Sequence, residues 1–163
     1  MYVANVDEPS MHTGNKYSDI LQNGVKAEDA EVIIMSNSIE AQIAEMDNRD
    51  DRQLFMEEYG MTEPALNRLI QSAYQLLKLY TYFTAGVQEV SAWTIHEGWK
   101  APQAASVIHT DFEKGFIKAE VIGYNDFITY GSEAACRDAG KLRIEGKEYI
   151  VKDGDVMHFR FNV

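Results

Sequence analysis

His109, Thr110 and Asp111 form a polar run that holds the residue types of a catalytic set. A histidine beside a carboxylate can act as a general acid–base pair, and a threonine hydroxyl can act as a nucleophile. The run follows an apolar segment that begins at Pro102, so it stands where a helix is expected to end. Polar side chains at a helix end commonly bind its unpaired backbone groups. We therefore favour a structural role for His109 and Asp111, and we predict no catalytic residue.

Metal ligands are sparse in the sequence. His12, His96 and His158 have no second His or Cys at metal-ligand spacing, so we expect no zinc site. The single cysteine, Cys136, rules out an internal disulfide and is expected to pack on a helix face as a small apolar residue.

The sequence NVDE, residues 5–8, ends the first predicted strand, where a nucleotide-binding fold would contact the base. GTPases have Asn-Lys-x-Asp at this place, and its final carboxylate accepts hydrogen bonds from guanine. Here Val6 replaces the lysine that packs along the base, and adenine offers a ring acceptor that gives a carboxylate no matching donor pair. Ser36 and Asn37, after the second predicted strand, could contact the base in the same way. Both signals are short, so an ordinary exit from a strand into a turn is the alternative.

No G-x-x-x-x-G-K-[ST] motif occurs in the 163 residues. Without this phosphate cradle and its metal-holding hydroxyl, the chain cannot hydrolyse a nucleotide by the P-loop route. The sequence therefore indicates either a protein that is no NTPase or the last part of one.

The net charge of −11 is unevenly distributed, with 5 Lys and Arg against 14 Asp and Glu in residues 1–77 and 10 against 12 in residues 78–163. The acidic first half argues against contact with a phosphate backbone there. No apolar run is long enough to cross a membrane, and the first residues soon turn acidic, unlike a signal peptide. We expect a cytoplasmic protein.

Strands and helices alternate in the first half. Buried-type strands at residues 2–6 and 32–35 are joined by a weakly amphipathic stretch, which suggests a βαβ unit with a parallel sheet. A helix capped by the residues around Ser36 should follow, then a charged helix at residues 50–59 with Leu54 and Phe55 inward. The strongest helical periodicity, from Leu66 to Leu77, predicts a packed core helix that starts near an N-cap at Thr62.

The second half alternates at period two from Leu79. We expect a hairpin of residues 79–85 and 89–95, a helix from Pro102 and a strand at residues 116–121. Short helices capped by Asn125 and Ser132 should follow, then a hairpin of residues 142–144 and 149–151 and a last strand that ends the chain. This order predicts a small mixed sheet wrapped on one helix.

Two loops of this half carry exposed-type residues that could bind a partner. Trp99 stands in a polar loop beside Lys100 and could stack on a nucleic-acid base. Lys114 lies at the end of the polar run that contains His109 and Asp111. Mixed surface charge and ordinary core aromatics are the alternative interpretation.

Long segments of the chain resemble the C-terminal region of the YchF/Obg-like ATPase family, a P-loop GTPase-like family. The similar segments are YVANVDE, IIMSNSIEAQIAEM, LNRLI, YFTAG, EVSAWTI, APQAASVIHTDFEKGFIKAEV, GKLRIEGKEYIVKDGD and the terminal HFRFNV. The resemblance therefore covers the whole chain.

This resemblance implies an α+β fold in two parts. Residues 1–78 would be the C-terminal remnant of an α/β P-loop NTPase domain, and residues 79–163 a TGS domain with a ubiquitin-like β-grasp fold. It implies ATP and Mg²⁺ as ligands of the whole protein, with neither expected on this part alone. It also implies association with the ribosome, on the large subunit or through RNA, and no membrane or DNA partner.

Residue by residue, the resemblance implies that Asn5, Val6 and Glu8 contact adenine and that Ser36 lies in the loop that helps to hold it. Because the loop of residues 95–101 and the junction of residues 109–114 are polar and carry aromatic residues, we expect the partner surface of the second half to include them, with Trp99, Lys100, His109, Asp111 and Lys114 as its candidate residues.

The chain departs from the family where Ser91 replaces Arg, Ser106 replaces Gly, and Asn37 with Ser38 replaces Ala-Lys. A stand-alone β-grasp module for a small ligand or protein, without a nucleotide role, is the alternative function. Because the first strands would lack their sheet neighbours in a C-terminal part, we also expect residues 1–78 to be loosely packed, rearranged or paired into dimers.

Overall fold

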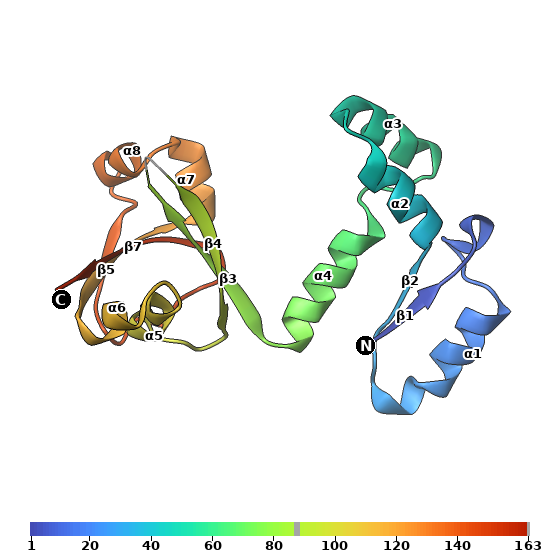
Figure 1. Cartoon of the computed structure of the whole chain (residues 1–163), viewed down its shortest axis with the longest axis horizontal. Helices are drawn as coiled ribbons and strands as arrows, with labels where there is room; N and C mark the ends of the chain where they lie inside the picture. Colours follow the sequence, from blue (N-terminus) through green and yellow to red (C-terminus); the bar gives the residue numbers. More distant parts are fainter. Residues whose placement is uncertain (87–88, 163) are drawn as a thin grey trace. The chain divides into compact units, whose positions relative to one another are not determined.

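The computed structural model describes residues 1–86 and 89–162, and the chain divides into two compact units, Met1–Leu76 and Leu77–Val163 (Figure 1). Val163, the last residue of the terminal segment HFRFNV, lies outside the described residues. Each unit has its own sheet. The longest helix of the described ranges has 12 residues, and none is both long and apolar enough to cross a membrane.

The first unit is built on two parallel strands, β1 (Tyr2–Asn5) and β2 (Val32–Met35), with Asn5 opposite Met35. Helix α1 (Lys16–Gly24) connects them, as the expected βαβ unit requires. Three more helices complete the unit: α2 (Asn37–Glu45), α3 (Arg49–Glu58) and α4 (Ala65–Leu76).

Side chains distant in sequence cap two of these helices, and both differ from the predicted caps. Ser36 occupies the N-cap position of α2 but makes no capping hydrogen bond; the Asn5 Oδ1 accepts the Asn37 N–H at 3.0 Å instead. Likewise α4 begins at Ala65 rather than near Thr62. The Glu40 carboxylate accepts the N–H of Ala65 at 2.8 Å. Its negative charge interacts favourably with the positive end of the α4 dipole.

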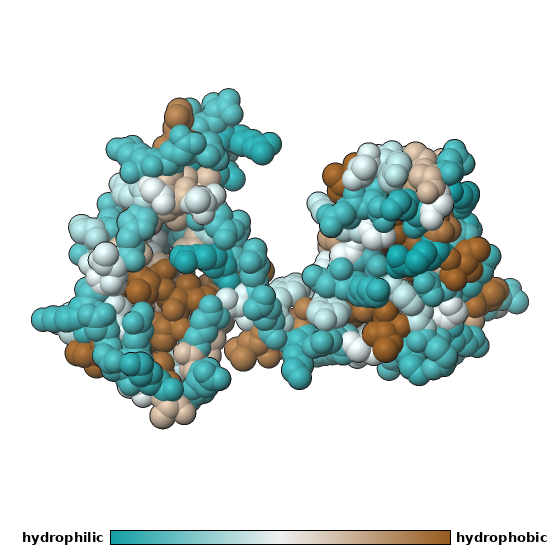
Figure 2. Space-filling model, turned by 180° about the vertical axis from the view of Figure 1, so that it is seen from behind, coloured by the Kyte–Doolittle hydropathy of each residue, from teal (hydrophilic) through white to brown (hydrophobic). Residues whose placement is uncertain are grey.

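The prediction that α4 is a packed core helix is wrong for this structure. Leu66, Ile70 and Leu76 are 47%, 48% and 62% exposed, although the apolar stripe itself is present. A sheet of two strands offers α4 too little surface to cover that stripe. Leu54, expected to face inward, is 64% exposed as well, whereas its neighbour Phe55 packs in the small core of α2 and α3. Apolar side chains accordingly show on the surface of this unit in Figure 2.

The second unit has a five-stranded mixed sheet in the order β4-β3-β7-β5-β6, in which β3 and β7 are parallel and the other neighbours antiparallel. Its strands are β3 (Leu79–Ala85), β4 (Val90–His96), β5 (Phe116–Gly123), β6 (Arg143–Glu145) and β7 (Asp155–Phe161). Its helices are α5 (Ala101–Ser106), α6 (Thr110–Lys114), α7 (Tyr124–Tyr130) and α8 (Glu133–Asp138).

Helices cover both faces of this sheet (Figure 1). On one face α5 packs on the main core, where the fully buried Tyr82 donates its hydroxyl to the Ala104 carbonyl at 2.9 Å. Burial raises the pKa of Tyr82, so this donor keeps its proton. On the other face Phe127 of α7 and Cys136 of α8 pack on Ile122 of β5, and the prediction that Cys136 is buried on a helix face is confirmed.

Two expectations about the second unit need correction. Residues 149–151 form no strand with residues 142–144. Because β7 already occupies one side of β5, β6 pairs with the other side, and Ile150 instead makes an isolated bridge to Lys100. Helix α7 starts one residue before Asn125, with Gly123 as its N-cap. The Ser132 cap of α8 is confirmed.

Candidate functional site

The predicted base-contacting residues gather where β1 and β2 end. The two strands are parallel and Asn5 lies opposite Met35, so Asn5 and Ser36 lie at the carboxyl ends of neighbouring strands. Ligands of α/β folds usually bind at this end of the sheet. The bond from the Asn37 N–H to the Asn5 Oδ1 ties this end to the start of α2. Because the Asn5 Oδ1 already accepts this N–H, the group that Asn5 can offer a ligand is its side-chain NH₂, which donates hydrogen bonds.

Glu8 is held at the same site by hydrogen bonds from two residues of α2. Its Oε1 accepts the Ser38 hydroxyl at 2.7 Å and the Gln42 Nε2–H at 3.4 Å. One carboxylate oxygen is thus held by the protein. Sequence reasoning missed Ser38 and Gln42 as supports of Glu8, although their spacing of four places them on one face of a helix.

Ser36 carries an unusual feature for a buried polar residue. It is 2% exposed, and its Oγ has no hydrogen-bond partner among the described residues. A buried hydroxyl without a partner costs free energy, but a ligand atom can bond to this Oγ only where the side chains that cover it move aside. Val6 differs from the other three residues: it is 8% exposed, so its side chain belongs to the core and offers a ligand little surface.

His109 and Asp111 do not form an acid–base pair. The His109 Nδ1 accepts the Asp111 backbone N–H at 3.2 Å and so caps α6. The Asp111 carboxylate lies 3.5 Å from the same nitrogen. That nitrogen cannot accept the N–H and also donate a proton to the carboxylate, so the two contacts exclude each other. The structural role predicted for His109 is confirmed, whereas Asp111 contributes its backbone N–H rather than its side chain to the cap.

Of the other predicted partner residues, Trp99 and Lys100 directly precede α5, and Lys114 is the last residue of α6. Trp99 is half-buried against the main core with its ring 5.5 Å from that of His96. Lys100 pairs with Glu148 at 2.5 Å, which neutralises its charge. Lys114 ends α6 and is exposed. The indole and this second lysine are therefore the groups best placed to contact a partner.

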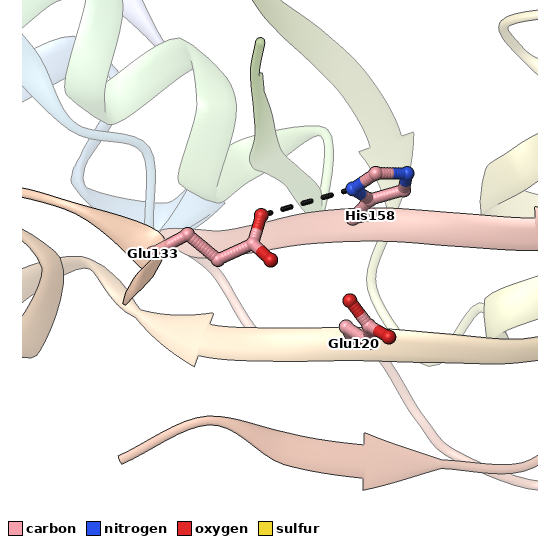
Figure 3. Close-up of side chains that lie close together, drawn as sticks. All are labelled: Glu120, Glu133 and His158. Atoms are coloured by element: carbon pink, nitrogen blue, oxygen red, sulfur yellow. Dashed lines mark ion pairs between the residues drawn. The ribbon is translucent and has the colours of Figure 1, made fainter. Parts of the chain in front are cut away.

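A cluster that the sequence did not reveal lies on the face of the sheet that α7 and α8 cover. Glu120 of β5, Glu133 of α8 and His158 of β7 place one ligand atom each within 4.8 Å of one another, and Figure 3 shows the ion pair of Glu133 with His158. Strand alternation predicts that Glu120 and His158 face outward, but only the register of β5 on β7 makes them neighbours.

This cluster is already charge-balanced. Arg137 and Arg160 lie 3.4 Å and 3.3 Å from the Glu120 carboxylate, and Arg137 also pairs with Glu133 at 2.9 Å. Burial raises the pKa of Glu120, but the hydrogen bond and charge of Arg160, with Arg137 and His158, outweigh it and lower the pKa overall. A cation would have to displace these guanidinium groups, so the arrangement is an ion-pair network.

Comparison with known proteins gives consistent matches. The model of the family YchF-GTPase_C, described as a protein of unknown function (DUF933), matches residues 79–162. The chain is 56% identical over its full length to the ribosome-binding ATPase YchF of Pasteurella multocida and covers 44% of that protein. It is 46% identical to Obg-like ATPase 1 of Gallus gallus, with 99% of this chain and 41% of that protein covered.

A solved structure of similar fold is that of the Schizosaccharomyces pombe YchF GTPase. The TM-score is 0.86 at 36% identity, and the match covers 98% of this chain and 43% of the other. The chain thus spans less than half the length of the relatives it matches, and its mixed α+β fold is theirs.

Proposed function

Because this chain belongs to the YchF family, we propose that it is a C-terminal part of a ribosome-associated, cytoplasmic ATPase. In this proposal its first unit recognises the adenine base. Its second unit, taken as residues 79–163, is a TGS domain that binds the ribosome or its RNA.

The observation that carries the nucleotide proposal is the set of polar groups around the start of α2. Asn5 offers an NH₂ donor, and Ser36 has a buried hydroxyl without a partner among the described residues. Ser38 and Gln42 hold one oxygen of Glu8, so the carboxylate has one oxygen left for a ligand. The single amino group of adenine needs one acceptor, whereas the adjacent N–H groups of guanine need two. This supports adenine over guanine.

Hydrolysis needs groups that these residues do not supply. The chain has no phosphate-binding G-x-x-x-x-G-K-[ST] sequence, so ATP and Mg²⁺ would be bound by the whole protein with the help of residues outside this part. We expect the 163 residues alone to be inactive as an ATPase and to contribute only the selection of the base.

The strand order of the second unit supports the β-grasp proposal. A hairpin, β3 and β4, is followed by helix α5 and then by β5, and the last strand β7 lies in the middle of the sheet beside β3. Helix α5 covers the face of the sheet on which Tyr82 is buried.

A chimaera tests the proposal. These 163 residues would replace the equivalent segment of the Pasteurella multocida YchF, 56% identical to them. We expect the chimaera to hydrolyse ATP in preference to GTP and to sediment with ribosomes. Changing Trp99→Phe together with Lys114→Glu should reduce the ribosome-bound fraction severalfold and leave ATP hydrolysis unchanged, because neither residue lies in the nucleotide unit.

Lys147→Glu is the matched control, since it makes the same charge change at an exposed turn of the same unit. Equal ribosome binding by all three proteins would exclude the proposed partner surface. A chimaera that prefers GTP would exclude the base-recognition proposal. Loss of both activities with a folded second unit would favour a stand-alone interaction module.

A further inference from the structure

Helix α4 is the last element of the first unit, and a side chain of another helix holds its start. The Glu40 Oε1 accepts the Ala65 N–H at 2.8 Å, and the Glu40 Oε2 accepts the Leu66 N–H at 3.3 Å. The first N–H groups of a helix have no partner within the helix itself. Both oxygens of this carboxylate, which projects from α2, therefore act as the cap of α4.

Packing stabilises α4 only weakly. Of its twelve residues, all of which the structure describes, only Ala65 is buried, and the apolar side chains of Leu66, Ile70 and Leu76 are exposed. A helix of this length is marginal in water without tertiary packing. Removing a side-chain cap lowers the equilibrium constant of helix formation about fivefold. The two bonds to Glu40 therefore contribute much of what keeps the first turn of α4 helical.

The turn of α2 that carries Glu40 also forms part of the candidate base site. Glu40 lies in the first turn of the helix. The Asn5 Oδ1 accepts the Asn37 N–H at the start of this turn. The Glu8 carboxylate accepts the Ser38 hydroxyl within it. Because one turn of a helix takes only 3.6 residues, a ligand that fixes Asn5 and Glu8 also fixes the backbone from which Glu40 reaches α4.

We propose that Glu40 couples the base site to α4, so that a bound adenine base increases the fraction of molecules in which the start of α4 is helical. This inference rests on the proposed function, because the ligand is the base assigned there. The element that changes is α4, between an ordered and a frayed start. Since α4 ends at Leu76 and β3 of the second unit begins at Leu79, α4 is the element through which the state of the base site can reach the partner-binding unit.

Amide exchange along α4 tests the coupling in the intact chain without a ligand. We expect Glu40→Ala to speed exchange in the first turns of α4 about fivefold, the effect of losing one side-chain cap. Glu40→Gln, which keeps one acceptor oxygen, should restore part of the protection. Asn5→Ala should also speed exchange in α4, although Asn5 bonds to α2, because it loosens the turn that carries Glu40. Glu45→Ala, at the exposed last residue of α2, is the matched control and should change nothing.

The chimaera with the Pasteurella multocida YchF tests the response to the base. We expect adenosine to shift the Asn37 amide resonance and to slow exchange in α4. In the Glu40→Ala chimaera adenosine should still shift Asn37 but no longer slow α4, a difference that a merely stabilising role of Glu40 would not produce. Because coupling is reciprocal, this chimaera should also bind adenosine more weakly.

The outcomes separate this inference from the proposed function. An Asn37 shift without any change in α4, or unchanged α4 exchange in the Asn5→Ala chain, would overturn the coupling and leave the base site intact. Adenosine that affects neither Asn37 nor α4 would exclude the base site, and the inference with it.

Discussion

The substitution Gly115→Ala is expected to destabilise the second unit by about 3 kcal/mol, at the upper end of overpacking costs. A Cβ added at Gly115 would lie 2.1 Å from the carbonyl oxygen of Asn162 and 2.9 Å from its carbonyl carbon. The two residues are tied by the bond from the Asn162 N–H to the Gly115 carbonyl at 2.9 Å. Because the obstacle is backbone rather than a side chain that can rotate, the start of β5 or the end of β7 must shift.

Urea unfolding followed by tryptophan fluorescence measures this effect selectively, since both tryptophans, Trp93 and Trp99, lie in the second unit. Gly146→Ala is the matched control: its Cβ would meet nothing within 4 Å and its φ is not positive, so stability should change by less than about 0.5 kcal/mol. Equal stability of the two variants would contradict the close approach of Gly115 to Asn162.

The second large effect is expected from Asp155→Ala. Asp155 is 3% exposed and accepts the Tyr149 hydroxyl at 2.7 Å and the Lys152 N–H at 3.0 Å, with the Arg143 guanidinium 3.6 Å away. Burial raises the pKa of Tyr149, and its bond to the Asp155 carboxylate raises it further, so its hydroxyl remains a donor. Removing the carboxylate leaves the Tyr149 hydroxyl and the Lys152 N–H without their acceptor, a loss of about 1–3 kcal/mol.

The same fluorescence measurement distinguishes the buried Asp155 carboxylate from that of Glu145, which is partly exposed. Glu145→Ala removes the other acidic partner of Arg143, but both side chains of that pair are partly exposed, so it should contribute less than about 1 kcal/mol. Asp155→Asn, which keeps one acceptor oxygen, should fall between the two. An Asp155→Ala protein as stable as Glu145→Ala would mean that the network does not hold β7 to the loop before it.

Period and turn chemistry predicted much of this fold. The alternation in residues 79–85 and 116–121 indicated strands that the structure contains as β3 and β5, and Pro102 marked the start of α5. The predicted pairing of residues 142–144 with residues 149–151 was wrong. The sequence at residues 142–151 has the appearance of a hairpin, yet β6 pairs with β5, because the partner of a strand depends on which sheet edge is open.

Part of the candidate site could likewise be predicted from the sequence, and part could not. Asn5, Glu8 and Ser36 were proposed from their positions after two strands and from the family resemblance, and the structure brings them to the start of α2. The supports of Glu8 could not be predicted, since Ser38 and Gln42 contact it only through the turn that follows β1. The unsatisfied Ser36 hydroxyl is likewise a property of packing, which composition and spacing do not encode.

Titration of the chimaera with nucleosides tests the central claim most directly, because adenosine and guanosine present the base without phosphates and the chimaera contains the rest of the nucleotide-binding domain. The backbone amide of Asn37 and the side-chain amide of Asn5 report on the site by NMR, since the two are joined by a hydrogen bond. We expect adenosine to shift both resonances, and Ser36→Ala to weaken this response. Guanosine shifts of equal size at the same residues, or adenosine shifts confined to other parts of the chain, would contradict recognition of adenine at this site.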